Sequence, residues 1–205
     1  MKWKTLGLLV LFIGAVITTN SQSPEKPFSG KDADTTLVNN LLQQSKEQFS
    51  ENPEKAISLA NQAKDLSEKV NFQTGKAYAL KNIGIVYYIQ GDYLESLQYW
   101  NESLGIFEKI NDETGVANLL NNIAAIYVER GDDEKALEYS LRSLKISEKL
   151  GDKLRILSAL NTVGSIYYNK KATWDKALDY LIRALPLCEE VGTNEQLGTI
   201  LGNIG

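Results

Sequence analysis

The sequence predicts an all-α solenoid of antiparallel helix pairs, because one motif recurs at a fixed spacing and each copy carries a helical pattern of apolar residues. The motif reads NIGIVYYIQGDY from Asn82, NIAAIYVERGDD from Asn122 and TVGSIYYNKKATW from Thr162, and a fourth copy begins with NIG at Asn203. Its small residue recurs at steps of 40, 40 and 41 residues, at Gly84, Ala124, Gly164 and Gly205. A fixed period of this length is typical of solenoids, in which each repeat packs only against its neighbours.

The first helix of each copy is predicted from apolar and small residues on one helical face. Their spacing of three, one and three residues brings them together on a helix with 3.6 residues per turn. The small residue permits close approach of a second helix, and we expect the tyrosine to fill the space beside it. The three sets are Leu80, Ile83, Gly84 and Tyr87; Leu120, Ile123, Ala124 and Tyr127; and Leu160, Val163, Gly164 and Tyr167.

A turn and a second helix complete each copy. Gly91-Asp92 and Gly131-Asp132 predict the turn, since glycine adopts left-handed backbone angles and aspartate caps the following helix. Small residues in the second helix again indicate close packing of two helices. They are found with larger residues in the sets Ser96, Trp100 and Ser103; Ala136, Ser140 and Ser143; and Ala177, Leu181 and Ala184.

The last helix pair departs from this pattern in two places. One extra residue in the turn from Lys170 to Trp174 accounts for the 41-residue step. Pro186 lies inside the second helix, where it removes a backbone donor, and we expect a kink there. The single cysteine, Cys188, is interpreted as a buried helix residue rather than a reactive thiol.

A degenerate copy over residues 35–72 precedes the regular ones. Its second helix begins at Asn52-Pro53, with proline at the favoured first position, and carries Ala56, Ala60 and Ala63. Its first helix lacks the Gly and Tyr pair, and we expect it to be built around Leu37, Leu41, Ser45 and Phe49. An atypical terminal repeat is expected because it caps the stack.

These residues resemble the tetratricopeptide repeat in its longer variety of about 40 residues. Kinesin light chains and bacterial peptide-pheromone receptors use similar long repeats. The resemblance covers residues 35–205 and implies a right-handed superhelix whose first helices line a concave face. After the degenerate copy, the repeats span residues 75–112, 115–152 and 155–192, with an incomplete one at 195–205.

The resemblance implies a peptide-binding groove on the concave face, formed by residues that flank the buried ones. This set is rich in amides, tyrosines and small side chains and holds little charge. An asparagine side chain offers a donor and an acceptor, as a peptide backbone requires, but it could equally bond to a neighbouring helix. The candidate residues are Tyr78, Lys81, Asn82, Ile85, Tyr88, Asn118, Asn121, Asn122, Glu129, Ser158, Asn161, Thr162, Ser165, Tyr168 and Asn169.

Composition argues against the other classes of function. The chain has no histidine and one cysteine, so the commonest general base is missing and a thiolate metal cluster is excluded within one chain. A formal net charge of −4 disfavours a nucleic-acid partner. Acidic pairs such as Asp132-Asp133 and Glu189-Glu190 are better explained as caps and solvated helix ends than as catalytic dyads. We therefore expect a non-catalytic scaffold without cofactor or metal, whose partner is a peptide or a protein.

The N-terminus has the layout of a secretory signal peptide. Lys2 and Lys4 precede the apolar run LGLLVLFIGAVI, and small residues follow at Thr19 to Ser21. We expect residues 1–21 to be cleaved after Ser21, residues 22–34 to form a flexible lead-in, and the protein to be exported, for example to the periplasm. The alternative is an uncleaved anchor in the membrane, although the run is shorter than the roughly 20 residues of a spanning helix.

A second hypothesis is the extracytoplasmic sensor region of a larger signalling protein. Signal peptides followed by such repeats resemble the outer regions of certain bacterial histidine kinases and nucleotide cyclases. The end at Gly205, halfway through a first helix, agrees with a longer parent chain. A further apolar segment of about 20 residues encoded beyond Gly205 would favour this hypothesis.

Overall fold

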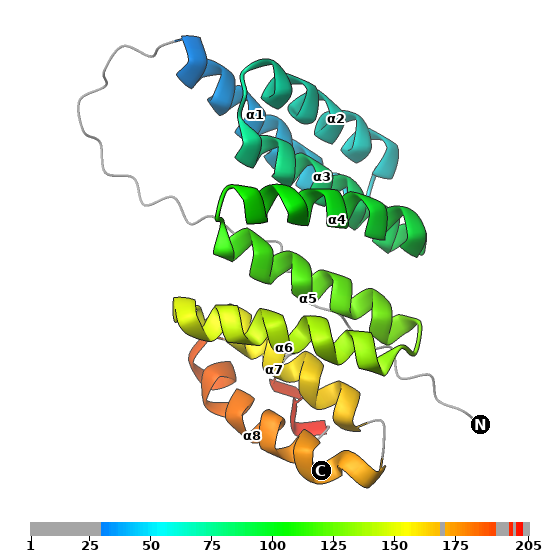
Figure 1. Ribbon diagram of the computed structural model, residues 1–205. Coiled ribbons are helices and arrows are strands. Elements are labelled where there is room, and N and C mark those ends of the chain that lie inside the picture. Colours follow the sequence, from blue (N-terminus) through cyan, green and yellow to red (C-terminus); the bar gives the residue numbers. More distant parts are fainter. Residues whose placement is uncertain (1–29, 169–170, 192–196, 199, 203–205) are drawn as a thin grey trace. The chain divides into compact units, whose positions relative to one another are not determined.

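A computed structural model describes residues 30–168, 171–191, 197–198 and 200–202, and in this part of the chain every regular element is a helix. The predicted signal peptide, Asn169 and Asn203 lie outside the described residues. The elements are α1 (Gly30–Glu47), α2 (Pro53–Lys69), α3 (Gln73–Gln90), α4 (Tyr93–Lys109), α5 (Glu113–Glu129), α6 (Asp133–Leu150), α7 (Lys153–Tyr168), the short 3-10 helix η1 (Lys171–Thr173) and α8 (Trp174–Val191) (Figure 1).

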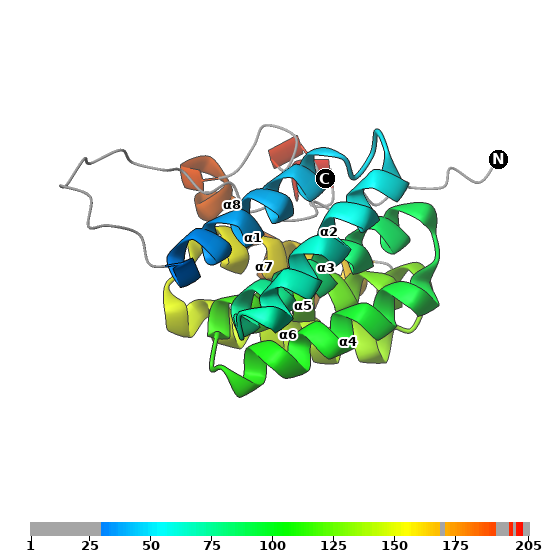
Figure 2. The same ribbon diagram turned by 90° about the horizontal axis from the view of Figure 1, so that it is seen from above.

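The chain divides into two compact units, and the boundary falls inside α5, between Leu119 and Leu120. In the N-terminal half, consecutive helices from α1 to α4 pack against one another, and α1 also contacts α3 (Figures 1 and 2). In the C-terminal half, α6 packs on α7 and α7 on α8. The first helices of the repeats are thus α1, α3, α5 and α7, and the second helices are α2, α4, α6 and α8. The predicted fold class, an all-α solenoid of helix pairs, is confirmed.

Close contact at the small residue of the motif is confirmed in two repeats. A Cβ added to Gly84 would lie 2.3 Å from Trp100 Cδ1, and one added to Gly164 would lie 2.7 Å from Leu181 Cδ2. Trp100 is fully buried, and its Nε1 donates to the Lys81 carbonyl at 3.1 Å. Glycine is therefore required where the second helix of the pair presents a large side chain.

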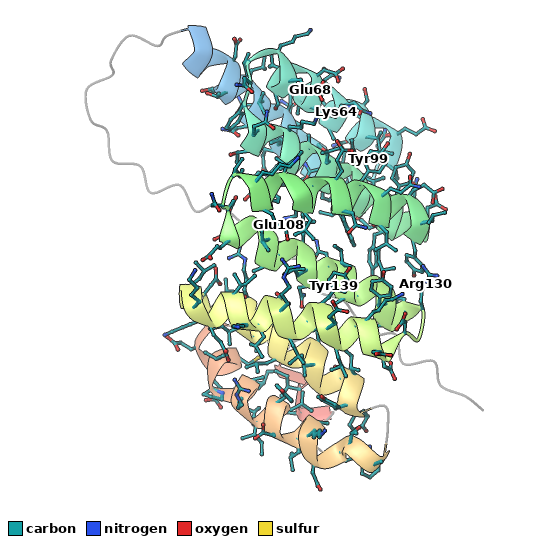
Figure 3. The ribbon with its side chains drawn as sticks, viewed as in Figure 1. Lys64, Glu68, Tyr99, Glu108, Arg130 and Tyr139 are labelled. Atoms are coloured by element: carbon teal, nitrogen blue, oxygen red, sulfur yellow. The ribbon has the colours of Figure 1, made fainter. Side chains whose placement is uncertain are left out.

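The motif tyrosines are half-buried and stack on a second tyrosine from the following helix. The ring centroids are 5.5 Å apart for Tyr87 and Tyr99, 5.5 Å for Tyr127 and Tyr139, and 5.8 Å for Tyr167 and Tyr180. Figure 3 labels the two partners Tyr99 and Tyr139 on their second helices. Burial raises the pKa of the Tyr87 and Tyr139 hydroxyls. In each regular repeat, a stacked tyrosine pair thus joins the two helices near the turn between them.

The turns within the repeats follow the predicted chemistry in part. Gly91 and Gly131 adopt left-handed angles, with φ of 85° and 70°. Asp132 caps α6 by accepting from the Lys135 amide at 3.2 Å. Asp92 lies at the equivalent N-cap but makes no side-chain cap bond, so this half of the prediction is wrong.

The first helix of the degenerate repeat differs from the prediction in its rotation. Ser45 and Phe49 are buried as expected, but Val38 and Leu42 take the core positions assigned to Leu37 and Leu41. Leu37 is 50% exposed. Helix α1 also begins at Gly30, within the segment expected to be a flexible lead-in. Without the Gly and Tyr pair, the sequence pattern did not fix which face of α1 packs inward.

Two expectations concern α8. The helix continues through Pro186 to Val191, so the proline does not end it, and the kink expected there stays a prediction. Cys188 is buried, and burial raises the pKa of its thiol. A neutral buried thiol agrees with the structural role expected for this cysteine.

Candidate functional site

In the N-terminal half, Asn82 does not face a groove but bridges two first helices. It is fully buried, and its Nδ2 donates to the Leu42 carbonyl of α1 at 3.1 Å. The bond spans one repeat, from position 82 back to position 42. Asn82 is therefore part of the packing between repeats, which is the alternative that the sequence left open.

The other candidates on α3 also pack within the protein. Lys81 is 5% exposed, and its Nζ lies 5.5 Å from the centre of the Tyr78 ring. Tyr88 stacks on Trp100 with ring centroids 5.6 Å apart, so its ring faces the second helix of its own pair. Ile85 is 2% exposed. The expected groove surface on α3 is thus largely occupied by contacts inside the N-terminal half.

Two candidates on α5 are buried but have amide atoms without a hydrogen bond. Asn118 is 7% exposed and Asn122 is 2% exposed. Among the described residues, Asn118 Oδ1 and Asn122 Nδ2 have no hydrogen-bond partner. They lie on opposite sides of the boundary between the two compact units, Asn118 in the N-terminal half and Asn122 in the C-terminal half.

In the C-terminal half, the structure brings three of the predicted residues together. Asn121 Nδ2 on α5 donates to Ser158 Oγ on α7 at 3.1 Å. Thr162 Oγ1 lies 3.4 Å from Asn121 Oδ1 and 3.0 Å from the Ser158 carbonyl. We call these three residues the α5–α7 polar cluster. Like Asn82, Asn121 joins first helices of successive repeats, but through side chains that are only half-buried.

Asn161 adjoins this cluster, since it precedes Thr162 on α7. It is half-buried, and its Oδ1 is shielded from solvent without a hydrogen-bond partner in the described part of the chain. A buried acceptor in this state costs about 1–3 kcal/mol and needs an explanation such as a bound water or a ligand. Ser165 is also half-buried, and Tyr168 is 41% exposed.

The face of α7 that holds these residues is uncharged. Glu129, a charged candidate in this half, is exposed at the end of α5. The cations at the start of α7 are engaged elsewhere, because Lys153 pairs with Glu190 and Arg155 with Asp152. The face can therefore offer hydrogen bonds and aromatic contact but no strong charge.

The role of Ser158 as a hydrogen-bond partner is visible only in the structure. The sequence places it among the candidates, yet its role as the acceptor for Asn121 depends on how α7 is rotated against α5. The signal that could have found the pair is the spacing of 37 residues, slightly less than one repeat. No group of three or more His, Cys, Asp or Glu residues that could hold a metal occurs among the described residues. No helix among them has the length and apolar character needed to cross a membrane.

A sequence comparison agrees with the helix pairs. The tetratricopeptide repeat family matches residues 73–149 and, in a second overlapping register, residues 115–172. Together with the 40-residue period and the packing of the pairs, this match shows that residues 73–172 consist of tetratricopeptide repeats. No curated protein sequence matches the chain significantly.

Solved structures show the same fold at low sequence identity. Aspartyl phosphate phosphatase F from Bacillus subtilis is 14% identical with a TM-score of 0.76, over 84% of this chain and 48% of that one. A signal transduction ATPase with a tetratricopeptide repeat sensor from Pyrococcus horikoshii is 20% identical with a TM-score of 0.72, over 83% and 27%. RapI in its apo form is 22% identical with a TM-score of 0.68, over 83% and 48%. The chain thus spans about half or less of the length of each of these proteins.

Proposed function

We propose that this protein is a non-catalytic scaffold that binds an extended, largely uncharged peptide segment on the first helices of its repeats. The observation that carries the proposal is the α5–α7 polar cluster with Asn161 beside it. Asn161 Oδ1 is an acceptor without a partner among the described residues, and a peptide N–H is a donor of the right kind once the half-buried side chain turns toward the ligand.

The cluster and its neighbours have distinct parts in this binding mode. Asn121, Ser158 and Thr162 hold α5 and α7 together and fix the face on which the ligand lies. Asn161 accepts a hydrogen bond from the ligand, and the exposed ring of Tyr168 offers an apolar wall with a polar tip. Because the face lacks charge, binding depends only weakly on salt.

A displayed library of random peptides tests this proposal with the purified protein as bait. We expect enrichment of uncharged sequences, and we expect Asn161→Ala to weaken the selected peptides by about 0.5–1.5 kcal/mol, up to roughly tenfold in Kd. Asn101→Ala is the matched control, because Asn101 is an exposed amide on the second helix α4. Equal affinity of both variants, or no enrichment at all, would contradict the proposal. Asn82 is unsuitable for this test because its side chain is buried and bonded to α1.

We also propose that the protein is exported, on the strength of the N-terminal sequence alone. N-terminal sequencing of the protein from the cell envelope is expected to begin at Gln22. A chain that retains Met1 would favour the membrane-anchored alternative.

The sensor role is the second candidate, and one comparison favours it. The repeats of the Pyrococcus horikoshii neighbour are described as a sensor within a signal transduction protein. The deciding observation is whether a spanning segment of about 20 apolar residues and an output domain are encoded beyond Gly205. In that case the binding face would report ligand occupancy to another domain.

A further inference from the structure

The second helices of the C-terminal half carry exposed apolar residues, and these meet the proposed peptide site at the stacked rings of Trp174 and Tyr168. We call this surface the α6–α8 face, and it consists of Leu141, Trp174, Leu178 and Ile182, which are 37%, 49%, 41% and 53% exposed. Arg183 Nη2 donates to Glu148 Oε1 at 2.7 Å and so links the second helices α6 and α8. Leu141 is seven residues, or two turns, from Glu148, and Ile182 adjoins Arg183. Trp174, Leu178 and Ile182 form the main part of the face, and the Arg183–Glu148 pair joins α8 to the helix that carries Leu141.

The repeat register shows that apolar residues are not required at this position. Steps of 40, 40 and 41 residues relate Asn61, Asn101, Leu141 and Ile182 on the four second helices. The first two copies carry asparagine, as a solvated position would allow, whereas the last two carry large aliphatic residues. A single exposed leucine is ordinary, but a contiguous exposed apolar patch marks an interaction site.

On α8 the apolar residues form a stripe with an ordered aromatic end. Trp174, Leu178 and Ile182 are spaced by four residues, so they lie on one face of the helix. Trp174 Nε1 donates to the Tyr168 carbonyl at 2.9 Å, and the two rings stack with centroids 6.3 Å apart. The exposed indole is thus held in place before any partner arrives, which lowers the entropic cost of binding.

The charges beside the stripe indicate the chemistry of the partner. Asp175, Asp179 and Glu189 are exposed along one edge, and none of them forms an ion pair within the part of the chain that the structure describes. The cations of α8 are engaged inside the protein. Arg183 binds Glu148, and Lys176 Nζ lies 5.5 Å from the centre of the Tyr167 ring. On α8 this edge therefore presents negative charge next to the apolar stripe, and on α6 the exposed Lys145 lies one turn from Leu141.

We propose that the α6–α8 face binds an amphipathic helix of a partner protein, whose apolar stripe is flanked by lysine or arginine. Apolar residues at positions i, i+3 or i+4 and i+7 of that helix would cover Trp174, Leu178 and Ile182. Its basic flank would lie against Asp175 and Asp179. This surface adjoins the first-helix face, because Trp174 stacks on Tyr168.

Three synthetic peptides of equal length test the proposal by fluorescence anisotropy with the full chain. The first has a leucine stripe flanked by lysines, the second has glutamates in place of the lysines, and the third is a scrambled form of the first. We expect the first peptide to bind at least tenfold more tightly than the other two. Its affinity should fall as salt rises, because exposed charges are screened. The emission of the exposed Trp174 should shift to shorter wavelength on binding.

Variants locate the binding surface. Leu178→Asn with Ile182→Asn should weaken the first peptide at least tenfold without unfolding, because the two side chains are 41% and 53% exposed and Asn101 already occupies the position equivalent to Ile182. Asp175→Asn with Asp179→Asn should remove the preference for lysine over glutamate. Leu94→Asn is the control, since Leu94 on α4 is 63% exposed and lies outside this face. Equal binding of all three peptides, no effect of the Leu178 and Ile182 pair, or a concentration-dependent dimer of the wild-type chain that the same pair abolishes would overturn the proposal.

Discussion

At the scale of single residues, the contact between Gly84 and Trp100 offers the sharpest test of the packing. Gly84→Ala places a Cβ within 2.3 Å of the buried indole, and we expect a loss of about 1–3 kcal/mol in the free energy of unfolding. Gly105→Ala is the matched control, since a Cβ at this helical position on α4 meets nothing within 4 Å. It should stabilise the protein by about 0.5–1 kcal/mol through helix propensity. Urea unfolding of the two variants gives the comparison, and equal effects would show that the close contact is misplaced.

Asn82 distinguishes a packing role from a binding role at one position. Asn82→Ala removes the bond to the Leu42 carbonyl, and we expect the free energy of unfolding to fall by about 0.5–1.5 kcal/mol. Asn101→Ala, at an exposed position of α4, should change it by less than about 0.5 kcal/mol. A solvent-facing Asn82 would instead give a more stable alanine variant, because alanine is the better helix former. Thermal and urea unfolding both show whether Asn82→Ala lowers or raises the free energy of unfolding.

At the scale of elements, the two glycine–aspartate turns differ in how their caps work. Asp132 accepts from the Lys135 amide, whereas Asp92 makes no side-chain cap bond. We expect Asp132→Ala to lower the melting temperature more than Asp92→Ala. The Lys135 amide and ammonium hold the pKa of Asp132 below its ordinary value. The cap therefore contributes above the unfolded pKa and is lost as the pH falls through the lower folded pKa.

Because the pKa of Asp132 is lowered in the folded protein, the two aspartates should differ in how their effect on stability depends on pH. The difference in melting temperature between Asp132→Ala and the wild type should shrink as the pH is lowered from neutral to acidic conditions. The Asp92→Ala difference should change less. A penalty for Asp132→Ala that is constant with pH would contradict an ionised cap.

The helices were predictable because each depends on a pattern within its own segment. The 40-residue period, the small residues and the glycine turns determine where the pairs begin and which faces of the regular helices are buried. Leu80 and Ile83 are in the core as predicted, at 2% and 0% exposure. The left-handed turns between repeats, at Asn71, Asn111 and Gly151, follow the same period.

The candidate site was less predictable, because its residues depend on contacts between repeats. Asn82 and Asn121 look alike in sequence, yet one donates to a backbone carbonyl in the preceding repeat and the other to a serine in the following one. Which partner each asparagine bonds to depends on the acceptor within its reach. That acceptor is set by the rotation and separation of two helices about 40 residues apart in the chain. In α1, where the Gly and Tyr pair is missing, the sequence pattern assigned to Leu37 and Leu41 the core positions that Val38 and Leu42 occupy.

At the scale of the whole molecule, the repeats are stabilised mainly by contacts with their neighbours. In the N-terminal half, α1 to α4 pack in chain order with one additional contact between α1 and α3, and α6 to α8 follow the same rule in the other half. The stability of such an array is approximately a sum of local and nearest-neighbour contributions. A defect in one pair should therefore raise local opening nearby more than it does several helices away.

Two equivalent glycines in different halves allow a reciprocal test of this locality by native-state hydrogen exchange. Gly84→Ala forces a Cβ against Trp100, and Gly164→Ala forces one against Leu181 at 2.7 Å. We expect the first variant to speed exchange mainly in α3 and α4, and the second mainly in α7 and α8. Each variant is the control for the other, because the substitution and its position in the repeat are the same. If both accelerate exchange equally throughout α1 to α8, the chain opens as one cooperative unit, and nearest-neighbour contacts do not limit how far a defect spreads.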